Sequence, residues 1–226
     1  MDDMTKKSSD PGKYGGGAVA KKPWFDTFGI PSLDKLVMIV INLWGAPGSG
    51  KSTTAAGLFF LMKINKYKVE LVTEYAKDLV WERHDTMFEN QLSIFSEQNR
   101  RLHRLVDHGV DLAITDSPLL LPSFYKPNGY YREFDALVAE TFHSYNNLNY
   151  FLNRVESFEK IGRRHNEEES LIISDKLQDF MKAHGVEFMN MEANPLTPQK
   201  IFDDIQRLQK GPIPMPFDLS RETESP

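Results

Sequence analysis

The chain has 226 residues and a formal net charge of −5, which argues against a dominant basic surface for nucleic acid. It contains no cysteine, which excludes a disulfide, a zinc–thiolate site and a thiol nucleophile. No apolar run is long enough to cross a membrane, and no apolar stretch of a signal peptide follows the amino-terminal lysines. We therefore expect a cytoplasmic protein with no membrane partner, with enough chain for one substantial α/β core.

The two ends of the chain differ from its middle. Residues 1–22 are polar and glycine-rich, so we expect a disordered arm, either a solvated tail or a basic arm that contacts nucleic acid or a partner. Residues 23–209 are predicted to form one domain. Residues 210–226 contain four prolines and no periodicity, which predicts a loose tail.

The segment GAPGSGKST has the Walker A or P-loop pattern, G-x-x-x-x-G-K-[ST]. An apolar, β-branched stretch before it predicts a buried strand over 36–44, and a helix is predicted over 53–63. In this order the loop amides and the helix N-terminus point at phosphate oxygens. Lys51 can reach the β- and γ-phosphates, and the Ser52 hydroxyl can ligate Mg²⁺. The predicted nucleotide-binding residues are Gly45, Ala46, Pro47, Gly48, Ser49, Gly50, Lys51, Ser52 and Thr53.

A second strand is predicted over 67–73, followed by Glu74 and a helix over 75–81. Ligands in an open parallel sheet bind beyond the carboxyl ends of the strands, which makes Glu74 a candidate site residue. The alternative is an exposed carboxylate favoured at a helix start by the dipole. We expect this strand to lie beside both the strand that ends at the P-loop and the strand that ends at Asp116.

The next elements are an amphipathic helix over 85–108 and a third strand over 110–116. Gln98 and Arg101 are neighbours on the helix surface and can together hold a base edge or a phosphate, although a solvated charged face is the commoner meaning. The third strand ends in Asp116, a Walker B-like pattern whose carboxylate can hold Mg²⁺ directly or through water.

The second half of the predicted domain contains a tyrosine-rich loop over 124–132, in which Tyr125, Tyr130 and Tyr131 either stack on a base or pack on the surface. A charged segment over about 154–169 carries Arg163 and Arg164. It is predicted either to be a lid whose arginines stabilise a transferred phosphoryl group or to be a plain surface helix. The remaining predictions are helices over 134–145, over 167–184 and from 197 onward, and strands over 149–152 and 186–189.

This order of elements resembles the small P-loop kinases, the nucleoside and nucleotide kinases and their relatives, over roughly residues 36–208. It looks closest to the AAA-like ATP-binding kinases that include nicotinamide riboside kinase domains. It is also similar to P-loop proteins encoded by tailed bacteriophages, through GAPGSGKSTTAAGL, VTEYAKDLVWE, EQNRR and ITDSPLLL.

The resemblance implies an α/β P-loop NTPase fold, a parallel five-stranded sheet with helices on both faces, and ATP and Mg²⁺ as cofactors. In nucleoside kinases the carboxylate after the second strand binds or deprotonates the acceptor hydroxyl, and Glu74 matches that place. Ser117 stands where those kinases often carry an arginine, which leaves Arg154 and the predicted lid to supply positive charge. The implied catalytic residues are Lys51, Glu74, Asp116, Arg163 and Arg164, with Ser52 and Asp116 at the metal.

We therefore predict a kinase that transfers the ATP γ-phosphoryl group to a hydroxyl or phosphate of a small nucleoside-like acceptor. One alternative is a phage-type kinase of the host cytoplasm that acts on a hydroxymethylated pyrimidine base or an end in DNA. Such a DNA acceptor would need a basic track, for which the candidates are Lys6, Lys7, Lys21, Lys22, Arg100, Arg101 and Arg104. A second alternative is an ATPase or switch without an acceptor, although Ser117 replaces the glutamate expected of an AAA+ motor.

Overall fold

A computed structural model describes residues 38–83, 85–154 and 167–210, all within the unit Asp34–Pro226. Its strands are β1 (Ile39–Trp44), β2 (Val69–Val72), β3 (Leu112–Thr115), β4 (Asn146–Arg154) and β5 (Met189–Ala193). Its helices are α1 (Lys51–Ile64), α2 (Tyr75–Trp81), the 3₁₀ helix η2 (Asp85–Glu89), α3 (Gln91–Val106), α4 (Leu121–Tyr125), α5 (Phe134–Ser144), α6 (Glu167–Ala183) and α7 (Thr197–Lys210). None of these described helices has the length and apolarity needed to span a bilayer.

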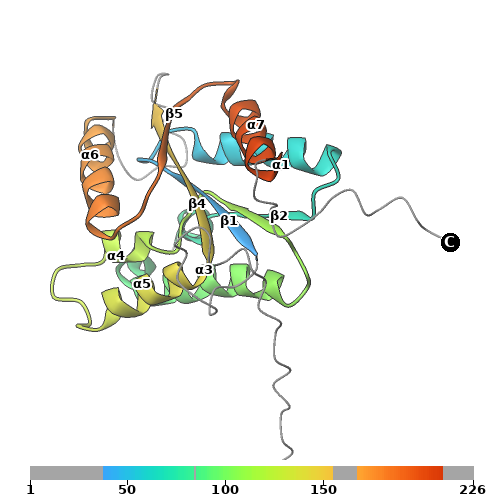
Figure 1. The fold of residues 1–226 in the computed structure, drawn as a ribbon. Coiled ribbons are helices and arrows are strands. Elements are labelled where there is room, and N and C mark those ends of the chain that lie inside the picture. The colour runs from blue at the N-terminus through green and yellow to red at the C-terminus, as the bar shows by residue number, and fades with distance from the viewer. Residues whose placement is uncertain (1–37, 84, 155–166, 211–226) are drawn as a thin grey trace, which may run out of the picture. The chain divides into compact units, whose positions relative to one another are not determined.

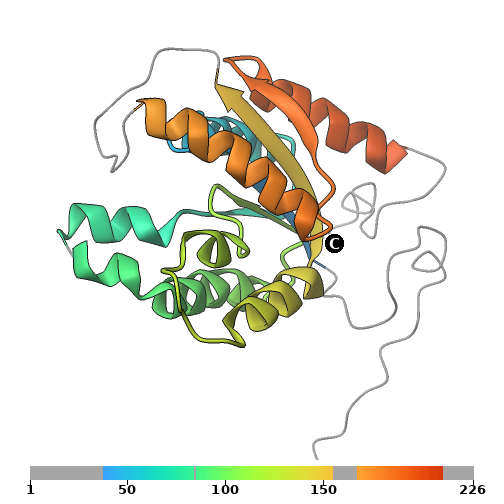
Figure 2. The ribbon, with the colours of Figure 1, turned by 90° about the vertical axis from the view of Figure 1, so that its left-hand side faces the viewer.

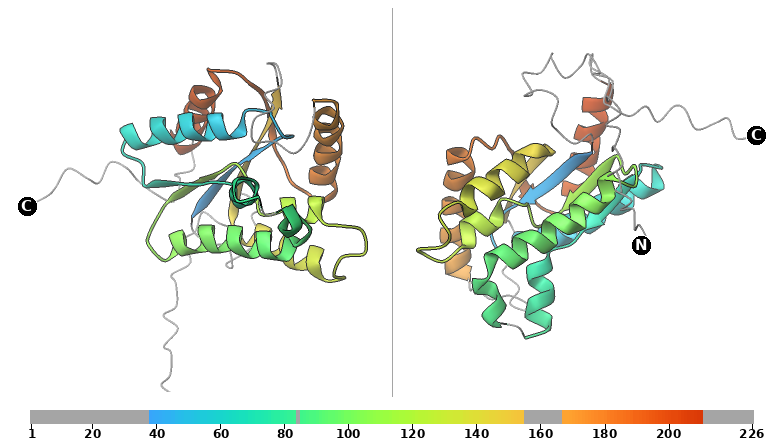
Figure 3. Two further views of the ribbon diagram at one scale, coloured as in Figure 1. Left: turned by 180° about the vertical axis from the view of Figure 1, so that it is seen from behind. Right: turned by 90° about the horizontal axis from the view of Figure 1, so that it is seen from below.

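The five strands form one parallel sheet in the order β2-β3-β1-β4-β5. Helices α1 and α7 cover one face, and α3, α4 and α5 cover the other (Figure 1). Seen from the side, α6 and α7 lie on opposite sides of β4 and β5 (Figure 2), and the view from behind again separates α1 and α7 from α3 (Figure 3). The predicted α/β class, with a five-stranded parallel sheet and helices on both faces, is confirmed.

The core consists of two apolar clusters, one on each face of the sheet. Successive strand side chains point to opposite faces. Ile41 and Leu43 of β1 therefore pack in the cluster of α1 and α7, and Val40 and Trp44 pack in the other. Because both faces are covered, β1 is buried along its whole length, which explains its nearly continuous apolar sequence.

A buried polar network supports the end of β1. The Asn42 side chain donates to Asn147 Oδ1 at 2.9 Å and to Asn149 Oδ1 at 3.1 Å. The indole N–H of Trp44, the residue immediately before the P-loop, donates to the same Asn149 oxygen at 3.0 Å. Buried polar groups need such partners. The network therefore ties β1 to β4 directly beneath the loop.

The structure differs from the predictions in two helical regions. The helix predicted over 85–108 is divided into η2 and α3, because Asn90 caps α3 by accepting from the Ser93 amide at 3.1 Å. The short helix α4 was not predicted, and it ends at Tyr125 inside the predicted tyrosine-rich loop; a proline in its first turn suits a helix start.

The strand predictions also need corrections. Strand β4 is longer than predicted, spanning Asn146–Arg154, and β5 begins at Met189, where the prediction over 186–189 ends. The paired residues explain this placement, since Tyr150 of β4 lies opposite Met189.

The expectation that β2 would lie beside both the strand that ends at the P-loop and the strand that ends at Asp116 is wrong. It pairs with β3 alone, and β3 lies between β2 and β1.

The contact between α1 and α7 depends on Gly57. A Cβ atom at this position would lie 2.8 Å from Pro198 Cγ. In an open helix, Gly→Ala stabilises by about 0.8–1.0 kcal/mol. Overpacking against a rigid proline ring costs about 1–3 kcal/mol, so Gly57→Ala should lower the free energy of unfolding. Denaturant unfolding measures this, and a gain in stability would contradict the close packing of the two helices.

Candidate active site

The P-loop joins β1 to α1 through a backbone that requires glycine. Gly45, Gly48 and Gly50 have φ values of 142°, 86° and 83°, in the region that side chains disfavour. At Gly45 an added Cβ would also lie 2.7 Å from the Leu152 carbonyl oxygen of β4. The loop therefore needs both the conformational freedom and the small size of glycine at this point.

The amino-terminal end of α1 is suited to bind an anion. Its N-cap, Gly50, provides no side-chain cap, and the first turn contains no acidic residue. Such a helix end presents backbone N–H groups and a partial positive charge. Ser49 Oγ is buried and has no hydrogen-bond partner among the residues that the structure describes. Lys51 Nζ donates to Gly45 O at 2.7 Å and to Ala46 O at 3.0 Å, which holds the ammonium group against the loop.

The predicted metal-binding residues come together. Ser52 Oγ donates to Asp116 Oδ2 at 2.6 Å, across 64 residues of sequence. A hydroxyl and a carboxylate are hard oxygen ligands that suit Mg²⁺. Within the described parts of the chain, no three His, Cys, Asp or Glu residues form a metal-binding group. A Mg²⁺ ion held by Ser52 and Asp116 would therefore complete its coordination with water and nucleotide phosphate.

Glu74 lies at the same edge of the sheet, just after β2. Its backbone N–H donates to Asp116 Oδ1 at 3.0 Å, so one carboxylate contacts both the P-loop helix and the start of α2. Burial raises the pKa of Glu74, the charge of Lys51 opposes that rise, and the charge of Asp116 adds to it. The structure thus brings Lys51, Ser52, Glu74 and Asp116 together, although β2 and β1 are not adjacent.

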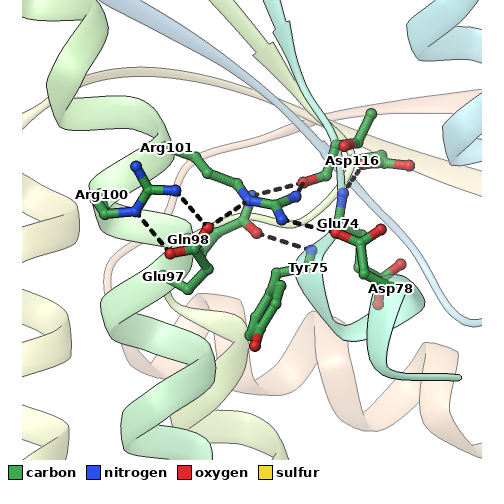
Figure 4. Close-up of polar contacts among 9 residues, drawn as sticks. Glu74, Tyr75, Asp78, Glu97, Gln98, Arg100, Arg101 and Asp116 are labelled. Carbon is green, nitrogen blue, oxygen red and sulfur yellow. Dashed lines mark hydrogen bonds and ion pairs between the residues drawn. The ribbon is translucent and has the colours of Figure 1, made fainter. Parts of the chain in front are cut away.

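Gln98 and Arg101 have a different environment from the one predicted. Gln98 is buried, and its carboxamide accepts from the Tyr75 N–H (Figure 4). It also donates to the Thr73 carbonyl and to the Thr115 hydroxyl. The sequence indicated that the two residues are neighbours, with a base edge, a phosphate or a solvated charged face as the alternatives, and none of these is the environment of Gln98. The spacing showed that the two side chains are neighbours on α3, but not that they pack against the segment that carries Glu74.

Arg101 makes its contacts within the protein as well. Its guanidinium pairs with Asp78 at 2.7 Å and with Glu97 at 3.0 Å, and it lies 5.1 Å from the centre of the Tyr75 ring. Hydrogen bonds from Arg100, and then from Arg101, lower the pKa of Glu97 to about 2. Two of the three arginines proposed for a basic track, Arg100 and Arg101, are therefore paired with carboxylates of the protein itself.

The three tyrosines of the predicted stacking loop have separate roles. The Tyr130 hydroxyl accepts from the Leu92 N–H at 3.0 Å, so it satisfies a backbone donor in the first turn of α3. Tyr131 packs edge-on against Tyr130 and is 67% exposed. Burial, and then the nearby charge of Glu74, raise the pKa of Tyr125. Of the three, Tyr125 is therefore the one whose hydroxyl group is influenced by the charge of Glu74.

Of the three arginines predicted to supply positive charge, the structure describes Arg154. Arg154 is the last residue of β4, whose carboxyl end lies at the same edge of the sheet as the end of β1, since Trp44 pairs with Phe151. Arg163 and Arg164 lie outside the described residues, as do most of the predicted lid, the predicted arm over 1–22 and the tail beyond residue 210.

The sheet, the glycine-dependent loop before α1 and the Ser52–Asp116 pair together define a P-loop NTPase fold. The sequence matches the family model described as an AAA domain over residues 40–197. The chain therefore belongs to this family of AAA domains.

Two solved structures are similar to this chain at low sequence identity. The thymidylate kinase from Ehrlichia chaffeensis is similar at a TM-score of 0.50 and 13% identity, covering 75% of this chain and 99% of that chain. The protein APE1195 is similar at a TM-score of 0.41 and 18% identity, covering 78% of this chain and 98% of that chain. The similarity to the thymidylate kinase concerns the fold alone. A search of the curated proteins finds no significant match.

Proposed function

We propose that this protein is a Mg²⁺-dependent kinase that transfers the γ-phosphoryl group of ATP to a hydroxyl or phosphate of a nucleoside-like acceptor. The observation that carries the proposal is the position of Glu74 beside the nucleotide and metal residues, linked to Asp116 by a 3.0 Å hydrogen bond. A P-loop ATPase without an acceptor needs a nucleotide site and a positioned water. A partly buried carboxylate at the end of β2, the strand beside β3, suits an acceptor hydroxyl.

The residues divide the chemistry among them. The loop amides and Lys51 bind the phosphates and counter the charge that develops on the transferred group. Ser52 and Asp116 would hold Mg²⁺, which would neutralise phosphate charge. With a hydroxyl acceptor, Glu74 accepts the hydroxyl proton as the acceptor oxygen forms its bond to the γ-phosphorus and the bond from phosphorus to the ADP oxygen breaks. Arg163 and Arg164 remain proposed suppliers of positive charge from the segment after β4.

A small acceptor is favoured over DNA. The overall charge is −5, and Arg100 and Arg101 of the proposed basic track pair with Glu97 and Asp78. The ring of Tyr125, which is 37% exposed and whose hydroxyl is influenced by the charge of Glu74, is a candidate stacking surface for one heterocyclic base. A single base near one carboxylate is the recognition expected of a nucleoside or nucleotide.

A radiolabelled-ATP transfer screen tests the proposal. The acceptors are nucleosides, nucleoside monophosphates, nicotinamide riboside and DNA containing hydroxymethylpyrimidine. We expect labelled product from a small acceptor, with an affinity that changes little with salt. An acceptor affinity that falls more than tenfold between low and physiological salt, and falls further on deletion of residues 1–22, would instead identify DNA as the substrate. ATP hydrolysis that no acceptor alters would contradict the kinase assignment.

A further inference from the structure

We propose that Gln98 is a positioning residue of this site, because its carboxamide fastens the chain on both sides of Glu74 to the strand end that carries Asp116. The catalytic consequence of this inference rests on the proposed kinase function. Gln98 lies in the middle of α3 and is only 1% exposed, so its side chain faces the fold and is not available to solvent.

The hydrogen bonds of Gln98 reach three chain segments at once. Its Oε1 accepts from the Tyr75 N–H at 3.1 Å, while its Nε2 donates to Thr73 O and to Thr115 Oγ1, both at 3.4 Å. Thr73 and Tyr75 are the two neighbours of Glu74. A carboxamide carries an acceptor and two donors in one plane, and here both kinds of atom are used.

The other side of this connection is the turn that carries Asp116. Thr115 is fully buried, and its hydroxyl accepts from the Ser117 N–H at 3.1 Å and donates to the Ser117 carbonyl at 3.2 Å. Asp116 in turn accepts from the Glu74 N–H. The amides of Glu74 and Tyr75, at the start of α2, are thus held by Asp116 and by Gln98, respectively (Figure 4).

The position of β2 explains why such a tie is needed. This strand is at the edge of the sheet and pairs with β3 alone, so only one strand fixes its carboxyl end. Arg101 contacts the same segment nearer the surface, through its ion pair with Asp78 and a 3.4 Å hydrogen bond to Thr73 O. Ion pairs near the surface contribute little, so of these two α3 side chains the buried Gln98 carboxamide constrains the segment around Glu74 more than Arg101 does.

Loosening this constraint should lower kcat without changing nucleotide binding. A displacement of about 1 Å at a reacting group can cost up to about 10²-fold in rate. Gln98→Met keeps an unbranched side chain but removes every hydrogen bond, so we expect kcat for phosphoryl transfer to fall by about tenfold or more. The KM for ATP should stay within about twofold, because the hydrogen bonds of Gln98 described above go to Thr73, Tyr75 and Thr115 and not to the P-loop, so uniform binding is unaffected.

Gln91→Met is the matched control. Gln91 lies on the same helix, is 5% exposed and donates to the Phe88 carbonyl at 2.7 Å, away from Glu74. Both variants lose a buried carboxamide, so a merely structural effect should appear in both. Only Gln98→Met should lower kcat and speed amide hydrogen exchange at Tyr75. If Gln98→Met does not fold, Gln98→Glu, which keeps the acceptor and loses the donor, replaces it.

The outcomes separate this inference from the proposed function. Parent-like kcat and parent-like Tyr75 exchange in the Gln98 variant would overturn the inference and leave the kinase assignment standing. Equal losses of kcat in the Gln91 and Gln98 variants would also overturn it, since both would then act through stability. If the parent protein transfers phosphate to no acceptor, the kinase assignment fails, and exchange at Tyr75 still decides whether Gln98 holds this segment.

Discussion

Replacing Lys51 with alanine should lower phosphoryl transfer by about 10²-fold or more, the cost of removing one preorganised electrostatic partner. The ammonium group lies against the loop, bonded to Gly45 O and Ala46 O, where it can counter charge on the β- and γ-phosphates. The substitution removes no core side chain, so the fold should survive. Steady-state kinetics at saturating ATP, together with thermal unfolding, measure both effects.

Lys63→Ala is the control for this substitution. It removes the same charge from the other end of α1, where the ammonium pairs with Glu70 at 2.8 Å on an exposed surface. A pair of this kind contributes about 0–1 kcal/mol to stability, and it lies away from the loop, so transfer should continue at the parent rate. Undiminished turnover of the Lys51 variant would contradict the role of the P-loop as a catalytic site.

Glu74→Gln should lower phosphoryl transfer by about 10²-fold or more while ATP binding survives. Glutamine keeps the size and one hydrogen-bonding oxygen but cannot accept the proton of the acceptor hydroxyl. The hydrogen bond to Asp116 is made by the backbone N–H of residue 74, so it does not depend on the side chain. Rapid-quench transfer assays and nucleotide titration distinguish the two effects.

Glu70→Gln, on the exposed surface of β2, is the matched control and should leave transfer unchanged.

The pH dependence of the reaction gives a second test of the role of Glu74. Burial raises the pKa of Glu74 above the ordinary value of a glutamate side chain. Because only the ionised carboxylate can act as a base, kcat/KM should fall as the pH drops through this raised pKa, and Glu74→Gln should lack that fall. Parent-like rates in the Gln variant would make Glu74 a helix-start carboxylate and leave Asp116 as the remaining candidate base.

The sequence by itself determined the features that depend on neighbouring residues. The strand, the glycine-rich loop and the following helix are consecutive, so the P-loop was recognised from the motif and its flanking periodicity. The aspartate after the third apolar strand was found in the same way. Alternation of strands and helices then predicted the parallel sheet.

Only the tertiary structure decided which residues meet across the site. Ser52 contacts Asp116 over 64 residues of sequence, and Gln98 contacts Tyr75 over 23. Periodicity identifies the face of a helix that is buried, but it does not identify the backbone groups that lie opposite that face. The order of strands is also a long-range property, so β3 between β1 and β2 followed from packing and not from local pattern. For this reason Gln98, for which the sequence left a ligand contact and a solvated face as alternatives, instead contacts the chain on both sides of Glu74.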